Sequence, residues 1–196
     1  MDDVMPVEIE GFSQVEYLTV FYTIIFGVIA AEYFSGWGSM LRHRKNIKIY
    51  SIHVVWSIFA FLTLIQNWYG IWPRVKYINN NILYFIFGLL PLFLFYLMTV
   101  VLFPNMKYAV ETDFKKHYFE NARVLFILFA IYLGITITGS YVYRDAGDVF
   151  MQNVLRSGGI ALALTGALYH HKKYFHIFFL TLMLGGLAAF ILVIPK

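Results

Sequence analysis

The chain has 196 residues, of which 60% are hydrophobic and only 13% are charged, and its formal net charge is +4. A water-soluble domain carries about 25% charged residues, so this composition excludes an ordinary soluble enzyme, and we predict no nucleic-acid partner. The chain has no cysteine, which excludes disulfides, thiolate metal sites and a covalently attached c-type haem.

Six apolar stretches follow one another, and each is long enough to cross a bilayer, which takes about 20 helical residues. They predict an all-α integral membrane protein, a single membrane domain over 1–196 with six transmembrane helices arranged as three antiparallel hairpins. The predicted helices cover about 17–40, 50–72, 81–103, 122–143, 150–170 and 174–194. The connections between them are too short to bury a core of their own, so we expect no soluble catalytic domain.

Lysine and arginine lie mostly in the connections after the first, third and fifth predicted helices. These connections hold Arg42, Arg44, Lys45, Lys48, Lys107, Lys115, Lys116, Arg123, Lys172 and Lys173. Cytoplasmic loops are enriched in such bases, so we predict that these three connections face the cytoplasm. Both termini, including the acidic segment 1–15, are then outside, and the expected location is a bacterial inner membrane, which the chain crosses several times.

The first predicted helix carries small residues at every fourth position, namely Gly27, Ala31 and Ser35. Small side chains let two helices approach closely in lipid. The stripe predicts either packing within the chain or the interface of a homo-oligomer. Glu32 interrupts the same helix, and a charged side chain at mid-bilayer costs about 2.5–3.5 kcal/mol. We expect its carboxyl group to face protein or water, within reach of the second helix.

Polar side chains recur along the second predicted helix, with His53, Trp56 and Ser57 in its inner half and Gln66 and Asn67 in its outer half. Counted along the helices, Trp56 and Ser57 should lie level with Glu32, and Gln66 and Asn67 level with Tyr22 of the first helix. Together with Glu32, these residues of the second helix form the candidate polar intramembrane site. The functional interpretation is a proton or cation site. The structural interpretation is hydrogen bonding that holds helices together, and the sequence leaves both open.

The later helices differ in character. The third, 81–103, is rich in phenylalanine and leucine and has no small-residue stripe, so we expect it to face lipid, with a bend at Pro91. The fifth and sixth carry small residues at the same spacing, and these faces are expected to meet in an antiparallel pair. The residues concerned are Gly159, Ala163, Gly185 and Ala189.

The six histidines all map to the cytoplasmic side of the predicted topology. Histidine is the commonest metal ligand, and membrane hydroxylases and desaturases gather histidines at this face. Their boxes resemble His-x-x-His-His repeats, which this chain lacks, and the lysines next to His170 and His171 would repel a cation. We therefore predict neither a metal nor another cofactor.

Three motifs in the first two helices carry a resemblance to known proteins. The first helix ends in Gly36-Trp37-Gly38-Ser39-Met40-Leu41-Arg42-His43-Arg44, the second begins with Tyr50-x-x-His53-x-x-Trp56, and Gln66-Asn67-Trp68 followed by Trp72 closes it. Over residues 17–123 the chain resembles a group of small prokaryotic polytopic membrane proteins without an established activity. The resemblance implies a bacterial membrane location and favours a role for His53, Trp56, Gln66 and Trp68.

Three functions fit these patterns. The first is an oligomeric ion or proton channel, or a protein that perturbs the membrane, with Glu32, His53, Gln66 and Asn67 along the polar path. The second is a non-transporting membrane anchor or sensor, whose basic connections would contact a protein partner or anionic lipid headgroups. The third is a membrane-embedded enzyme, for which the sequence offers no catalytic constellation. Beyond the lipid bilayer, the partner we expect first is a second copy of the chain.

Overall fold

The computed structural model describes residues 14–74, 82–104, 112–143 and 149–193, and statements about the structure refer to these residues. They form six α-helices, one short 3₁₀ helix and one pair of two-residue strands. The elements are α1 (Gln14–Arg42), β1 (Ile47–Lys48), α2 (Ser51–Tyr69), η1 (Trp72–Arg74), α4 (Ile82–Leu102), β2 (Thr112–Asp113), α5 (Phe114–Val142), α6 (Val149–Leu168) and α7 (Lys173–Val193). The predicted all-helical class is confirmed. Nearly all of the predicted acidic segment 1–15 lies outside the described residues.

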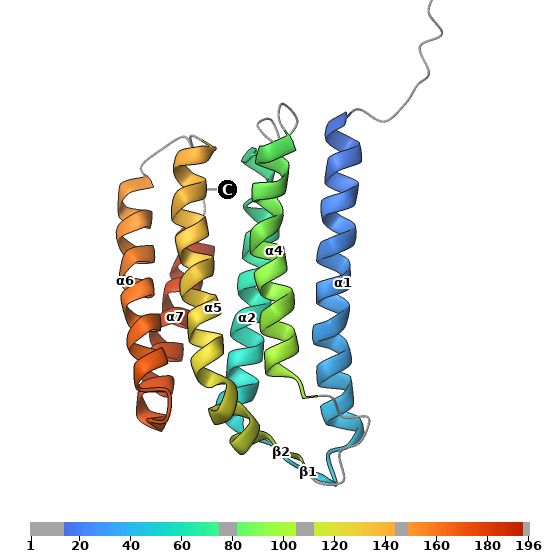
Figure 1. Cartoon of the computed structure of the whole chain (residues 1–196), viewed down its shortest axis with the longest axis vertical. Helices are drawn as coiled ribbons and strands as arrows, with labels where there is room; N and C mark the ends of the chain where they lie inside the picture. Colours follow the sequence, from blue (N-terminus) through green and yellow to red (C-terminus); the bar gives the residue numbers. More distant parts are fainter. Residues whose placement is uncertain (1–13, 75–81, 105–111, 144–148, 194–196) are drawn as a thin grey trace, which may run out of the picture.

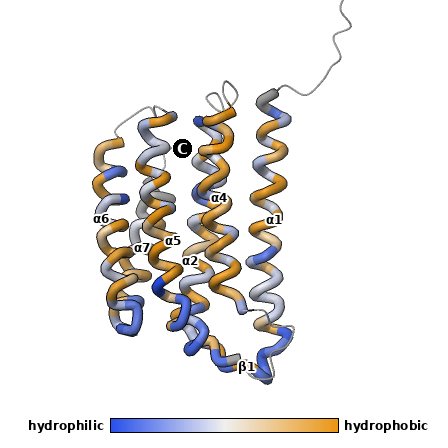
Figure 2. Tube along the Cα trace, in the orientation of Figure 1, coloured by the Kyte–Doolittle hydropathy of each residue, from blue (hydrophilic) through white to orange (hydrophobic). Residues whose placement is uncertain are grey.

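Four of these helices, α1, α2, α4 and α5, are long and apolar enough to cross a membrane. The helices lie side by side in one bundle, with α1 at one edge next to α4 and with α6 and α7 at the other edge (Figure 1). Hydrophobic residues cover most of their length, and hydrophilic residues gather at the end that holds β1 (Figure 2). We call this end of the bundle, which holds β1 and β2, the β1–β2 end.

The pairing of β1 with β2 joins two connections that are distant in sequence. The strands run parallel, with Ile47 opposite Thr112 and Lys48 opposite Asp113. Asp113 then starts α5, because its Oδ1 accepts hydrogen bonds from the backbone N–H groups of Lys115 (2.9 Å) and Lys116 (3.1 Å). Such a cap satisfies N–H groups that have no partner within the helix. It explains why α5 begins at Phe114 rather than near residue 122.

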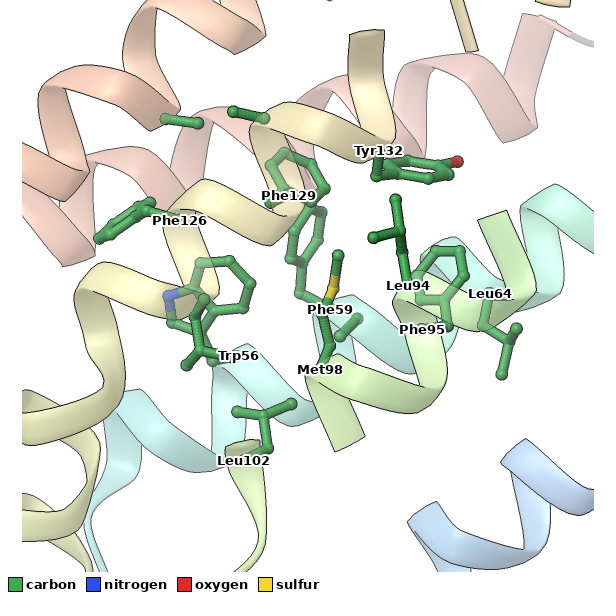
Figure 3. Packing of buried hydrophobic residues seen from close by; sticks show 14 of the residues in the cluster. Trp56, Phe59, Leu64, Leu94, Phe95, Met98, Leu102, Phe126, Phe129 and Tyr132 are labelled. Carbon is green, nitrogen blue, oxygen red and sulfur yellow. The ribbon is translucent and has the colours of Figure 1, made fainter. Parts of the chain in front are cut away.

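The core is built largely from aromatic rings. The Trp56 ring stacks on Phe179 with centroids 5.7 Å apart and meets the edge of Phe126 at 5.6 Å. Phe59 and Phe129 complete this cluster, with centroids 5.3 Å apart. Figure 3 shows these rings from α2 and α5 packed beside α4 residues. Aromatic pairs in such edge-to-face and offset geometries add about 0.5–1.5 kcal/mol each beyond the burial of their area.

The position of α4 differs from the expectation that this helix faces lipid. It contacts α1, α2 and α5, and Leu92, Phe95 and Met98 on one face are fully buried. Its other face, which includes Phe93 and Val100, is exposed. Large apolar side chains suit a helix core and a lipid-facing surface equally, so composition alone did not distinguish the two.

The small-residue face of α6 packs mainly against α5, although Gly159 also adjoins Met183 of α7. A Cβ atom on Gly159 would lie 2.8 Å from Leu133 Cδ1, and one on Gly166 would lie 2.6 Å from the Phe126 ring. Ala163, between them, is fully buried. Gly185 of α7 is exposed, with no atom within 4 Å of an added Cβ. The side chain of Ala189 lies outside the described residues. α1 packs more closely on α4 than on α2, and α6 packs more closely on α5 than on α7, whereas the predicted hairpin partners α4 and α5 do pack closely together.

Candidate functional site

The predicted site residues of α2 occupy two separate polar layers. His53, Trp56 and Ser57 lie in its first two turns, next to the β1–β2 end, whereas Gln66 and Asn67 lie in its last turn. Each layer forms hydrogen bonds with other helices. These hydrogen bonds show which part of each neighbouring helix lies level with each layer.

In the layer at the β1–β2 end, His53 is fully buried and its Nε2 lies 2.7 Å from the carbonyl oxygen of Leu102. Because a carbonyl can only accept, this ring nitrogen carries the proton. The bond satisfies the last residue of α4, whose carbonyl has no partner within the helix. The Nδ1 atom of His53 is buried without a hydrogen-bond partner among the described residues.

Ser57 links α2 to α1 in the same layer. The indole N–H of Trp37 donates to Ser57 Oγ at 2.9 Å, and Ser57 Oγ donates in turn to the carbonyl of Val54 at 2.8 Å. The sequence placed Ser57 level with Glu32, but the observed contact lies five residues further along α1. The partner is Trp37 and not Glu32.

A buried contact between Tyr118 and His176 joins α5 to α7 and was not found from the sequence. The Tyr118 hydroxyl lies 2.5 Å from Nδ1 of His176, whose Nε2 lies 2.7 Å from the carbonyl of His170. His176 therefore donates from Nε2 and accepts the Tyr118 proton at Nδ1. The indole nitrogen of Trp56, in the same layer, is buried without a hydrogen-bond partner among the described residues. Tyr118 and His176 are 58 positions apart in the chain, so no local spacing in the sequence could reveal their contact.

Two further histidines at this end form hydrogen bonds with carbonyl groups in the last turns of helices. Nε2 of His117 lies 3.0 Å from the Val101 carbonyl of α4. Nδ1 of His43 lies 2.9 Å from the Ser39 carbonyl of α1. Positive or hydrogen-bond-donating side chains are favourable at this end of a helix. Among the described residues, no three His, Cys, Asp or Glu side chains gather as a metal site would require.

At the opposite end, Asn67 Nδ2 donates to the Tyr22 hydroxyl at 2.9 Å, which agrees with the predicted register between the first two helices. A cavity of about 20 Å³ adjoins this pair and is lined also by Arg74, Pro91 and Thr136. A water molecule needs about 10–15 Å³ of such space and two to four polar partners. The cavity can therefore hold water. Gln66, next to the pair, is half-buried.

The two polar layers are separated by apolar side chains. Ser57 and Asn67 are ten residues apart on α2, which corresponds to about 15 Å along a helix. Between them, Phe59 and Leu64 of α2 are buried, as are Phe95 of α4 and Phe129 of α5. Within the described part of one chain, these side chains interrupt any polar path from one layer to the other.

Glu32 lies apart from both layers. Its side chain is exposed, whereas Tyr33, the next residue, is fully buried. The predicted contact of Glu32 with the second helix is not present among the described residues. Gly27, Ala31 and Ser35 are exposed as well, and an added Cβ on Gly27 would meet no atom within 4 Å. The stripe on α1 is thus not used for packing between the described helices.

Comparison of the chain with protein-family models, with curated proteins and with solved structures gives no match. Function therefore has to be inferred from the chemistry of these residues.

Proposed function

We propose that this protein is a homo-oligomer assembled through α1, and that the oligomer carries ions or protons along a path between its chains. The observation that carries the proposal is the exposure of Glu32 on a helix that is apolar enough to span a membrane. The path would follow Glu32 and Ser35, two exposed polar side chains of α1 that lie about 60° apart around the helix. The buried apolar layer leaves no comparable path inside one chain.

The free surface of α1 supports an interface there. Only 22% of its apolar stretch is buried, compared with 39% to 44% for the other three candidate spans. Gly27 and Ala31 would let a second helix approach closely, since association in lipid depends on packing at small residues. Each is exposed in the single chain, so both are free to make that contact.

The unfavourable free energy of exposing Glu32 to lipid supports the same interface. Ionisable side chains within membrane spans almost always face a protein interior or water, because exposure to acyl chains is unfavourable by about 2.5 kcal/mol or more. Within one chain Glu32 is exposed and makes no hydrogen bond or ion pair with the described residues. A second α1, or water between two copies of it, would supply the missing polar surroundings.

Membrane crossing by all six helices belongs to the proposal too. The polar residues of α6 are paired: Asn153 Nδ2 donates to Ser140 Oγ of α5 at 2.9 Å, and Arg156 Nη1 donates to Asn153 Oδ1 at 2.9 Å. Such pairing lowers the cost of placing α6 in a membrane. We propose that the bases at the β1–β2 end face the cytoplasm of a bacterial cell and that both termini lie outside.

The test uses the purified protein in liposomes and in lipid nanodiscs. Gly27→Leu should convert the oligomer into a monomer, as measured by its mass in nanodiscs, and should abolish ion or proton flux. Gly158→Leu is the matched control, because Gly158 is equally exposed and has no atom within 4 Å of an added Cβ, but lies on α6. It should leave mass and flux unchanged.

Glu32→Gln separates assembly from conduction. The amide keeps the size and hydrogen bonding of the carboxyl group, so the oligomer should persist. Flux should fall about tenfold or more, because a unit charge ~4 Å from a cation is worth about 4 kcal/mol near a protein surface. A wild-type protein that is monomeric in nanodiscs, or flux that is unaffected by Glu32→Gln, would contradict the proposal.

The second candidate is a non-transporting anchor or sensor for a protein partner. Two observations favour it: the apolar layer closes the single chain, and the β1–β2 pairing combines two basic connections into one surface. Absence of flux in liposomes, together with a monomeric mass, would make this the better proposal.

A further inference from the structure

We infer that the β1–β2 end binds the headgroups of anionic phospholipids in the leaflet that surrounds it. The described bases at this end are Arg42, Arg44, Lys45, Lys48, Lys115, Lys116, Arg123, Lys172 and Lys173, all exposed. The described acids here are Asp113 and Glu120. Nine bases and two acids leave a charge of +7 (9 − 2), which is complementary to phosphate groups.

The tertiary structure gathers these bases from three connections. The β1–β2 pairing places Lys48 opposite Asp113, directly before the first turn of α5. The contact of Tyr118 with His176 brings the start of α7, with Lys172 and Lys173, against the start of α5. Hydrophilic residues accordingly cover this end of the bundle (Figure 2). The positive charge at this end therefore comes from three connections that the fold brings together, and not from a single loop.

Helix stability does not explain the bases at the starts of α5 and α7. Lys115 and Lys116 stand in the first turn of α5, and Lys173 is the first residue of α7. The start of a helix carries a partial positive charge, so bases there are unfavourable. Their own ion pairing is weak, since the described pair, Lys116 with Glu120, is exposed with atoms 4.0 Å apart. An external anion would relieve this excess of positive charge.

Exposed apolar and aromatic side chains mixed with the bases favour lipid over a soluble partner. Leu41 and Ile49 flank the basic connection after α1, and Tyr169 and Tyr174 flank the one after α6; all four are more than half exposed. Tyrosine with nearby bases is typical of the membrane–water interface, where rings lie at the level of the headgroups. A base near such a surface contributes measurably to binding of anionic lipid.

The experiment measures which lipids the full-length protein retains in nanodiscs of equal phosphatidylglycerol and phosphatidylcholine content, by native mass spectrometry. Wild type should retain phosphatidylglycerol in preference. Lys48→Gln with Lys115→Gln should weaken this preference about fivefold for each lysine. Lys76→Gln with Lys196→Gln is the control with the same change of charge; these residues lie outside the described part and on the opposite side in the predicted topology. It should keep the preference.

Salt provides a measurement that needs no variant. Raising NaCl from about 0.1 M to about 1 M shortens the screening length from about 10 Å to about 3 Å, so the wild-type preference should fall steeply. Equal retention of both lipids, a preference insensitive to salt, or an equal loss in the test and control variants would overturn the inference. A protein partner at this end would give the first of these results. None of these results depends on whether the protein oligomerises or conducts ions.

Discussion

The contact of Gly166 with Phe126 predicts a sharp contrast between glycine-to-alanine substitutions on one helix. A Cβ at Gly166 would lie 2.6–2.7 Å from three atoms of the Phe126 ring, which is closer than such atoms can approach. Phe126 is fully buried, and its ring centroid is 4.9 Å from that of Phe179 and 5.6 Å from that of Trp56. The ring therefore has no space into which it can withdraw.

The expected magnitude follows from two opposing terms. Overpacking a close-packed core costs typically about 1–3 kcal/mol, while alanine favours a helix over glycine by about 1 kcal/mol. We expect Gly166→Ala to lower the free energy of unfolding by up to about 2 kcal/mol. Gly159→Ala should cost less, because Leu133 Cδ1, 2.8 Å from the added Cβ, is the end of a side chain that can rotate. Gly158→Ala, with open space around it, should be neutral or stabilising.

The measurement is unfolding in mixed micelles with increasing sodium dodecyl sulfate, followed by far-ultraviolet circular dichroism. A second variant, Gly166→Ala with Phe126→Leu, should recover part of the lost free energy, since the smaller side chain makes room for the new methyl group. Equal stability of Gly166→Ala and Gly158→Ala would refute the description of the α5–α6 interface.

Two further predictions concern the polar layers and use the same unfolding assay. Tyr118→Phe should lower the free energy of unfolding by about 1–3 kcal/mol, because it leaves the buried Nδ1 atom of His176 without a donor; the same substitution should cost less in a protein that carries His176→Leu, and an equal loss in both backgrounds would count against the hydrogen bond. Asn67→Ala should cost less, about 0.6 kcal/mol as for an average hydrogen bond between membrane helices, because water in the adjoining cavity can replace the amide as partner of Tyr22. A loss equal to that of Tyr118→Phe would argue against a hydrated cavity.

The sequence by itself determined the helical class and the depth of residues along the first two helices. Long uncharged runs leave helices as the way to satisfy every backbone group in lipid, and each run holds a helix, although α5 begins at Phe114, well before its run. Depth follows from the constant rise per residue. Counting residues was therefore enough to place Asn67 level with Tyr22, whereas Ser57, placed level with Glu32, bonds Trp37 instead.

Only the tertiary structure decided which face of each helix is covered and by which neighbour. Glu32 was expected against α2 but is exposed, and the small residues of α6 meet α5 more closely than α7. Apolar side chains fit lipid and protein equally well in a membrane, so the pattern of hydrophobicity does not mark the packed face. The Tyr118–His176 contact and the β1–β2 pairing were likewise beyond prediction, because each depends on how distant helices are arranged and not on any local spacing of residues.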